Sequence, residues 1–398
     1  MRVLMFGWEF PPHNSGGLGV ACRGLTKSLA DAGVHVTFVL PRKTEITDSH
    51  LNVIFPPRER IHSRYLDVLL SPYLTSTLYE NIRRGMNGSY ALDMFSEVMR
   101  YAAAAEDIAL TEHFDVIHAH DWLAFPAGLA AKKATGKPLI LHVHLPSVDQ
   151  GASLGFDDRV FAIERESFEA ADAVIAISHR VRELLESKYG VPREKIYVIH
   201  NGLLMEHEDY VPTVKIKPNG GAVALYMGRL TLHKGPDIFL RAAEVAIRHN
   251  TNMRFVVAGS GEMDRQLLYQ AAAVGLGRYV FFAGFVRGSE RKALLRAADM
   301  LVMPSVAEPF GLIALEAAAE GVPTIISKQS GVRDVLKNSL AADFWDVEML
   351  AQHMLAVAAY KPLHDTLARE GSREAQQSTW DVSAQRCIAL YTACVTAS

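Results

Sequence analysis

The sequence has few cysteines and lacks long apolar runs. Its three cysteines, Cys22, Cys387 and Cys394, form no CxxC pair, which argues against a disulfide framework and suits a reducing compartment. Every apolar run is shorter than the roughly twenty residues that a membrane helix needs. The opening MRVLMFGWEFPP is interrupted by Glu9 and two prolines, so it resembles a first strand more than an export signal. We therefore expect a cytoplasmic protein without a transmembrane segment.

Neither sign of charge dominates the sequence. It contains 41 Lys and Arg against 44 Asp and Glu, for a net charge of -3, and has neither a basic arm nor an acidic tail. Binding to nucleic acid is therefore not expected. At 398 residues and 49% hydrophobic, the chain is too long for one typical core and apolar enough to form two.

Short apolar runs of β type alternate with helical stretches through most of the sequence. In the first half these runs fall at 3–7, 34–40, 115–120, 138–144, 173–178 and 195–200. In the second half they fall at 222–228, 253–261, 279–286, 299–305 and 322–327. Such alternation is typical of a parallel sheet with helices on both faces. We predict an α/β protein of two Rossmann-like, doubly wound domains.

The domain boundaries follow from where this alternation breaks. Residues 206–221 are polar and contain Pro and Gly, which is typical of a linker. We therefore expect one domain at 1–205, a linker at 206–221, a second domain at 222–375 and a terminal helix at 376–398. Residues 44–110 are less regular, and we expect them to be mainly helical.

The first candidate site is the loop NSGGLGV at 14–20. Adjacent Gly16 and Gly17 would let the backbone approach a ligand, and a helix N-terminus offers amides to an anion. A dinucleotide fingerprint requires a third glycine where this chain has Cys22, so a nicotinamide enzyme is not expected. An ordinary flexible turn is the alternative.

The second candidate site is HAHDW at 118–122, where a strand ends. Alternation places His118 and His120 on the same face of that strand, with Asp121 pointing elsewhere, so we expect no metal site. We interpret His118 as a core residue and His120 as a hydrogen-bonding partner of a substrate hydroxyl or phosphate. The pair of histidines at 142–144 raises the same question.

The third candidate site is MGRLTLHKGPD at 227–237, which follows the first strand of the second domain. Arg229 and Lys234 lie there just ahead of a helix, where a diphosphate would gain a bidentate fork and a point charge. Two solvated surface cations are the alternative.

The fourth candidate site is EPFGLIALE at 308–316. We expect Pro309 to lie in a first helical turn, just after Glu308. Helical spacing puts Glu316 on an apolar stripe with Leu312, Leu315 and Ala319. A carboxylate there needs donors, which ligand hydroxyls or a buried arginine could provide. Glu308 could also accept from hydroxyls.

Together these motifs resemble the retaining glycosyltransferases of the GT-B fold, and specifically those of family four. The resemblance implies two domains that face each other across a cleft, an acceptor-binding domain at 1–205 and a nucleotide-sugar-binding domain at 222–375. The most specific element is the E-x7-E pattern of Glu308 and Glu316, which follows GRLTLHKG and GSGE (259–262) in the order usual for that family. The resemblance implies that Glu316 binds the nucleotide ribose and that Glu308 lies beside the donor sugar. It further implies that Arg229 and Lys234 neutralise the diphosphate. It assigns nucleotide-sugar contacts to the backbone or loops at Gly16, Gly17, Gly259, Phe285, Val286, Gly311 and Leu312.

The amino-terminal half is similar to the bacterial glycogen and starch synthases, in its first loop and in HAHDW. It departs from them at Asn14 and Val20, where those synthases usually carry Lys and Asp, and in having Glu316 as a second glutamate. Glucan synthesis is therefore one possible activity within family four.

The resemblance implies a retaining, metal-independent hexosyltransferase that needs no cofactor. The donor would be a UDP-, ADP- or GDP-sugar, with glucose the first candidate and mannose the second. The acceptor would be a hydroxyl of a glucan or another saccharide, and His120 would orient the donor sugar. A GT-B epimerase and a non-catalytic sugar-nucleotide-binding protein are the alternatives.

Overall fold

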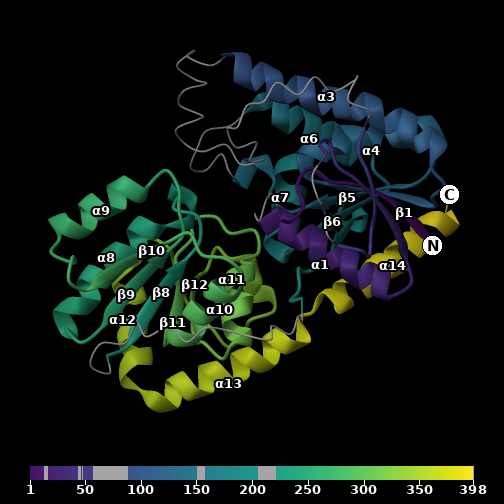
Figure 1. Ribbon diagram of the computed structural model, residues 1–398. Helices are drawn as coiled ribbons and strands as arrows, with labels where there is room; N and C mark the ends of the chain where they lie inside the picture. Colours follow the sequence, from purple (N-terminus) through teal and green to yellow (C-terminus); the bar gives the residue numbers. More distant parts are fainter. Residues whose placement is uncertain are drawn as a thin grey trace. The chain divides into compact units, whose positions relative to one another are not determined.

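The computed structural model describes residues 1–12, 17–43, 46, 48–56, 88–149, 157–204 and 221–397. The chain divides into two compact units, Met1–Gly202 with Trp380–Ser398, and Leu203–Thr379. In each unit a parallel sheet has helices on both faces (Figure 1), as the alternation of the sequence predicts. None of the described helices is both long and apolar enough to cross a bilayer.

The described part of the amino-terminal unit contains a seven-stranded sheet in the order β3-β2-β1-β4-β5-β6-β7. Its strands are β1 Arg2–Phe6, β2 His35–Val39, β3 Asn52–Ile54, β4 Val116–His120, β5 Leu139–Val143, β6 Ala173–Ala176 and β7 Ile196–Val198. All paired strands run parallel. Every residue of β4 and β5 is buried, as expected for central strands that are covered on both faces.

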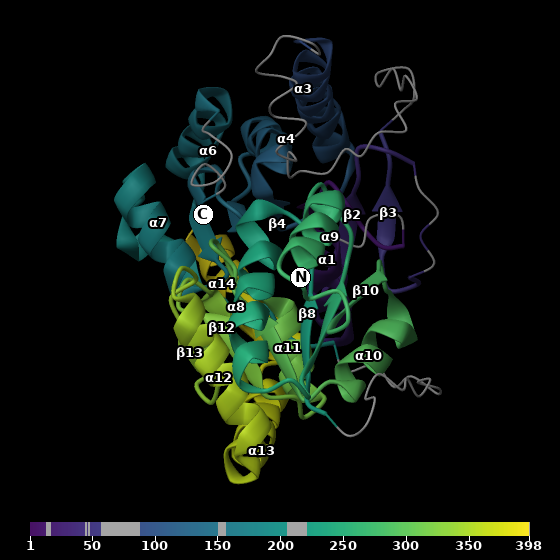
Figure 2. The ribbon, with the colours of Figure 1, turned by 90° about the vertical axis from the view of Figure 1, so that its left-hand side faces the viewer.

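Two groups of helices cover this sheet. The first group packs together, α4 against both α3 and α6, and the second consists of α1 and α14, which also pack together (Figures 1 and 2). The helices of the unit are α1 Gly17–Asp31, α3 Gly88–Thr111, α4 Asp121–Thr135, α6 Asp158–Ala170, α7 His179–Tyr189 and α14 Trp380–Ala397. Thus the C-terminal helix, whose docking the sequence does not predict, belongs to the amino-terminal unit.

The described part of the second unit contains a six-stranded parallel sheet in the order β10-β9-β8-β11-β12-β13. Its strands are β8 Val223–Met227, β9 Arg254–Ala258, β10 Val280–Gly284, β11 Met300–Met303, β12 Thr324–Ser327 and β13 Leu340–Ala342. Its helices are α8 Pro236–His249, α9 Asp264–Ala273, α10 Gly288–Ala297, α11 Leu312–Ala319, α12 Val347–Ala359 and α13 Lys361–Gln377. Helix α8 packs against α9 and α12, while α11 packs against α13.

The predicted strands are confirmed, but two short ones were missed. Strands β3 and β13 contain three residues each, and β3 lies in a stretch expected to be mainly helical. The predicted linker at 206–221 lies outside the described residues apart from Gly221, as does Gly16 of the first loop.

Candidate active site

The order of strands brings two loops together at the centre of each sheet. In the amino-terminal unit β1 lies beside β4, and in the second unit β8 lies beside β11. From each of these pairs the chain winds outward to opposite edges, and ligands of open α/β sheets bind at such a switch point. Three of the four predicted catalytic residues, Arg229, Lys234 and Glu308, follow β8 or β11.

The loops that follow β8, β9 and β10 are joined by backbone contacts. Gly228 N–H donates to the carbonyl of Ala258 at 3.0 Å, and Gly259 N–H donates to Gly284 at 2.7 Å. Gly259 has φ +144, and a Cβ there would lie 1.8 Å from the carbonyl oxygen of Gly228. Only glycine allows both this backbone conformation and this close approach. Gly259 therefore has a structural role in holding the loop after β8 in place.

Lys234 and Glu308 meet across the switch point. Lys234 lies at the end of a 3-10 turn, Leu232–Lys234, and its Nζ is 2.8 Å from Glu308 Oε2. Ser305 Oγ donates to the same carboxylate oxygen at 3.1 Å. Both charged side chains are largely buried, with 22% of Lys234 and 10% of Glu308 exposed. The pairing fixes the loop after β8 to the loop after β11.

Arg229 lies in the same loop as Lys234. Its carbonyl accepts a hydrogen bond from the buried Tyr226 hydroxyl at 2.9 Å. Burial, together with the charges of Lys234 and Arg229, lowers the pKa of His233 to about 3. His233 is therefore neutral, while two cations lie close to it, which concentrates positive charge at the carboxyl end of β8.

Helix α11 begins later than the sequence predicts. Its first residue is Leu312, so Pro309 precedes the helix and the prediction that it lies in the first turn is wrong. The reason is Gly311, which adopts φ +110 as the N-terminal cap and breaks the helical backbone. The first amides of a helix have no acceptor within it and are open to an anion. In α11 these amides precede Ala314, whose N–H donates to the carbonyl of Gly311 at 3.0 Å.

Glu316 lies in the middle of α11, with 19% of its side chain exposed. Its Oε1 is 3.1 Å from Nη2 of Arg291, whereas its Oε2 has no hydrogen-bond partner among the described residues. Burial raises the pKa of Glu316. The charge of Arg291 lowers this pKa, whereas the charge of Glu320 raises it. A partly buried arginine therefore does pair with Glu316, as one of the two expectations had it. This arginine contacts only Oε1, so Oε2 is available to a ligand as far as the described residues show.

The predicted apolar stripe needs a correction. The fully buried face of α11 is formed by Ala314, Leu315, Ala317 and Ala318. Glu316 lies with Leu312 and Ala319 on a side that is only partly buried. Because the helix is apolar almost all round, its periodicity could not show which stripe faces the core.

Phe285 and Val286 follow β10 at the edge of the sheet. Phe285 is 53% exposed, and the guanidinium of Arg287 lies over its ring, 5.1 Å from the centroid. Their position at a carboxyl strand end agrees with a loop that is accessible to a ligand.

In the amino-terminal unit, the carboxylate of Glu9 binds an amide in the first turn of α1. Gly17 is the first residue of the helix, and the N–H of Gly19 donates to Oε1 of the buried Glu9 at 3.2 Å. A negative side chain here stabilises the helix N-terminus and competes with an external anion. The predicted use of this terminus as an anion site is therefore weakened.

His120 is the last residue of β4, and Asp121 starts α4. Asp121 has φ 56, and its Oδ1 accepts the N–H groups of His144 at 2.7 Å and Leu145 at 3.3 Å. Burial raises the pKa of Asp121 to about 8, although the two backbone hydrogen bonds lower it. A buried acid with a raised pKa that is itself held at positive φ, as Asp121 is, is typical of a functional site.

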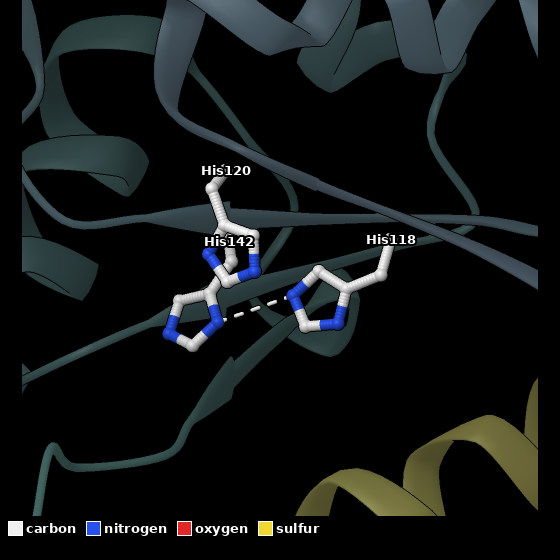
Figure 3. A group of neighbouring side chains, drawn as sticks. All are labelled: His118, His120 and His142. Atoms are coloured by element: carbon white, nitrogen blue, oxygen red, sulfur yellow. Dashed lines mark hydrogen bonds between the residues drawn. The ribbon is translucent and has the colours of Figure 1, made fainter. Parts of the chain in front are cut away.

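His118, His120 and His142 lie together in the core of this unit (Figure 3). Their ring nitrogens fall within 4.8 Å of one another, which is metal-ligand spacing. However, both nitrogens of His118 are hydrogen-bonded, Nδ1 to the Tyr391 hydroxyl and Nε2 to His142 Nδ1. The three rings are also nearly parallel, with interplanar angles of 15°, 22° and 27°, so their in-plane lone pairs do not converge. We interpret the group as a hydrogen-bonded cluster.

Four residues of the site were not predicted from the sequence. Ser305, Arg291 and Tyr391 contact Glu308, Glu316 and His118 respectively, while Asp121 accepts from the backbone of His144. Asp121 directly follows β4 and Ser305 lies two residues after β11, so both could have been included on that ground. Arg291 and Tyr391 lie on other helices, and no local pattern marks them.

Two family sequence models match this chain. Glycosyltransferase Family 4 matches residues 15–206, and Glycosyl transferases group 1 matches residues 212–373. A glycogen synthase of Mycobacterium tuberculosis is 28% identical over 85% of this chain and 80% of its own length. A D-inositol 3-phosphate glycosyltransferase of Thermobispora bispora is 28% identical over 95% of this chain and 90% of its own.

Solved structures share the fold. Sucrose-phosphate synthase from Thermosynechococcus elongatus superimposes with a TM-score of 0.78 at 21% identity, over the whole of both chains. HepE of Anabaena in complex with UDP-glucose gives a TM-score of 0.72 at 19% identity, over 99% of this chain and 100% of that one. The two sheets, the switch-point loops and the two family matches lead to one conclusion: this chain belongs to the GT-B glycosyltransferases of family 4 and is similar to glycogen synthases.

Proposed function

We propose that this glycosyltransferase is a retaining, metal-independent hexosyltransferase. It would take a hexose, glucose first and mannose second, from a UDP-, ADP- or GDP-sugar and transfer it to a hydroxyl of a glucan or another saccharide. The observation that carries the proposal is the ion pair of Lys234 and Glu308 at the switch point, with the open Oε2 of Glu316 in the helix that follows.

The main electrostatic task is to stabilise the leaving diphosphate. Breaking the bond between sugar and diphosphate puts negative charge on the leaving group and positive character on the sugar. Arg229 and Lys234, together with the amides at the start of α11, would neutralise the negative charge of the leaving diphosphate. These fixed charges do this without a divalent ion, so the reaction should proceed in a chelator.

Three acidic or polar groups would hold the rest of the donor. Glu316 Oε2 would accept hydrogen bonds from the ribose, since no described side chain occupies it. Glu308 would lie beside the hexose and position Lys234, and His120 Nε2, also unpartnered among described residues, would bind a sugar hydroxyl. The acceptor would attack from the side of the leaving group, whose diphosphate takes the proton, so the anomeric configuration is retained.

The relatives support a sugar-nucleotide donor more than any one acceptor. The structure of HepE contains UDP-glucose, which favours UDP-glucose as the first donor to test. Relatives at the same 28% identity carry the names of a glycogen synthase and of an inositol 3-phosphate glycosyltransferase. The acceptor therefore has to be found by assay.

The test is to measure nucleoside diphosphate release from UDP-glucose, ADP-glucose and GDP-mannose, with and without glycogen or maltooligosaccharides. Release that requires an acceptor and continues in EDTA supports the proposal, and NMR of the product should show an α linkage. Conversion of the donor without acceptor would indicate an epimerase instead. Binding with the donor left unchanged in every acceptor mixture would indicate a non-catalytic binding protein.

A further inference from the structure

In the described part of the amino-terminal unit, two histidines each have a ring nitrogen without a hydrogen-bond partner. His120 and His142 are register partners on the neighbouring strands β4 and β5, with ring centroids 5.0 Å apart. They are 0% and 1% exposed, yet Nε2 of each has no hydrogen-bond partner among the described residues. A buried polar atom without a partner is costly, so both nitrogens are candidates for ligand contacts. His120 already has that role in the proposed function, and His142 does not.

His142 is connected to the C-terminal helix through His118. The hydroxyl of Tyr391, on α14, lies 2.5 Å from His118 Nδ1, and His118 Nε2 lies 3.2 Å from His142 Nδ1. Figure 3 shows that the second ring nitrogen of His142 points away from His118. The contacts form a line from Tyr391 to His118 to His142, which ends on the unpartnered Nε2.

The direction of the hydrogen bonds in this line follows from elementary chemistry. A phenol is the better donor and an imidazole nitrogen the better acceptor, so Tyr391 O–H donates to His118 Nδ1. A neutral imidazole carries one proton, so His118 then holds it on Nε2 and donates to His142 Nδ1. By the same rule His142 holds its proton on Nε2. We propose that Tyr391, through His118, fixes His142 as an Nε2–H donor to a hydroxyl of the transferred hexose, beside the contact made by His120.

The ligand class follows from the state of these rings. Burial lowers the pKa of His142 well below its ordinary value, and neighbouring histidines lower it further, so the ring is neutral. A neutral N–H donor suits the oxygen of an alcohol, which can accept from it and still donate elsewhere. The assignment to a hexose hydroxyl rests on the proposed function. Tyr391 is then a positioning residue and His142 a specificity-determining one.

The first test uses ¹⁵N NMR of histidine-labelled protein, which separates protonated from unprotonated ring nitrogens. His142 should carry its proton on Nε2 in the wild type, and Tyr391→Phe should shift part of the population to Nδ1–H. Tyr360→Phe is a matched control, because Tyr360 is 65% exposed. A wild-type His142 protonated on Nδ1, or an unchanged tautomer in Tyr391→Phe, would overturn the inference.

The second test compares His142→Leu with His142→Gln, whose amide places a donor near the position of Nε2–H. With UDP-glucose as the probe, His142→Leu should lower kcat/KM by about tenfold or more, and His142→Gln should recover most of that loss. The exposed His113, replaced by leucine, is the control. A panel of UDP-deoxyglucoses, each lacking one hydroxyl, tests which hydroxyl His142 contacts. For one analogue the wild type should show a lower kcat/KM than for UDP-glucose, and this difference should disappear in His142→Leu.

The outcomes separate this inference from the proposed function. If His142→Leu discriminates against every analogue as strongly as the wild type does, the proposed role of His142 is overturned. The hexosyltransferase proposal would still stand in that case, provided that the wild type transfers the sugar. If the wild type releases no nucleoside diphosphate from any donor, the proposed function fails, and the NMR experiment still decides the tautomer.

Discussion

Lys234 and Glu308 form an ion pair of 2.8 Å that joins the loops after β8 and β11. A lysine held by a glutamate is directed toward a fixed position and keeps two further donors for a ligand. In the proposed reaction the diphosphate lies there, and Glu308 sets the position of the cation that stabilises it.

Replacing Lys234 with alanine should therefore lower turnover strongly without unfolding the protein. Loss of one well-placed stabilising donor typically costs on the order of a hundredfold in rate. The measurement is kcat with UDP-glucose, together with circular dichroism and thermal unfolding. Lys361→Ala is the control, since that side chain is 82% exposed. Turnover close to that of the wild type in Lys234→Ala would refute the assignment of this lysine to the diphosphate.

Glu316→Gln should weaken binding of the nucleotide. The change keeps the size of the side chain but removes the charge that accepts from ribose hydroxyls, worth roughly 1.5–3 kcal/mol for a hydrogen bond to a charged group. Calorimetric titration with UDP should show about a tenfold or greater rise in Kd. Glu320→Gln is a close control, because Glu320 has a similar exposure of 17% and an ion pair of its own. Equal affinities in Glu316→Gln and the wild type would remove Glu316 from the nucleotide site.

Gly259→Ala should destabilise the second unit. The new Cβ would lie 1.8 Å from the carbonyl oxygen of Gly228, at a φ of +144 that alanine rarely adopts, so the loops after β8 and β9 must separate. We expect a loss of about 2 kcal/mol or more in the free energy of unfolding. Gly277→Ala is the control, since its Cβ would meet nothing within 4 Å. Equal denaturation midpoints for the two variants would show that the close packing of these loops is not required.

The amino-terminal unit should lose stability as the pH falls from about 6.5 to about 5. Four buried histidines are held neutral in the folded state but protonate near a pKa of about 6.5 when unfolded, so the unfolded state binds more protons. Burial lowers the pKa of two of them to about 3 and of the other two well below 6.5, the four being His118, His144, His120 and His142.

Two carboxyl groups act in the opposite direction. Burial raises the pKa of Asp121 to about 8 and of Glu164 to about 7, so these acids favour the folded state as the pH falls. At a pH of about 6.5 the two effects nearly cancel, because the unfolded histidines are then only half protonated. As the pH falls toward about 5, four histidines against two acids leave a net uptake that approaches two protons on unfolding, worth roughly 1.4 kcal/mol per proton and pH unit. Denaturant titrations across this range measure the slope, which His142→Gln should reduce by about one proton. Stability that rises on acidification would contradict this balance.

The sequence could predict single residues of the site but not their partners. Strands at 115–120 and 138–144 were recognisable because burial on both faces makes them continuously apolar, whereas β3 and β13, three residues each, give too little pattern. Lys234 and Glu308 were each marked by a motif, yet the bond between them joins positions 74 apart and depends on the order of strands.

The C-terminal helix illustrates the same limit. Tyr391 reaches His118 across 273 positions of sequence. An apolar helical pattern shows that a helix will pack, but it does not show which surface it will cover. The contact that orients the histidine cluster was therefore visible only in the folded chain.

The central claim is that the loops after β8 and β11 bind the diphosphate of a sugar nucleotide. Thermal unfolding with UDP-, ADP- and GDP-glucose tests it most directly, because a ligand at one hundred times its Kd adds about 2.7 kcal/mol to stability. The account predicts that at least one of these donors stabilises the wild type and that the Arg229→Ala, Lys234→Ala double variant loses most of that gain. No stabilisation by any donor, or equal stabilisation of the double variant, would contradict it.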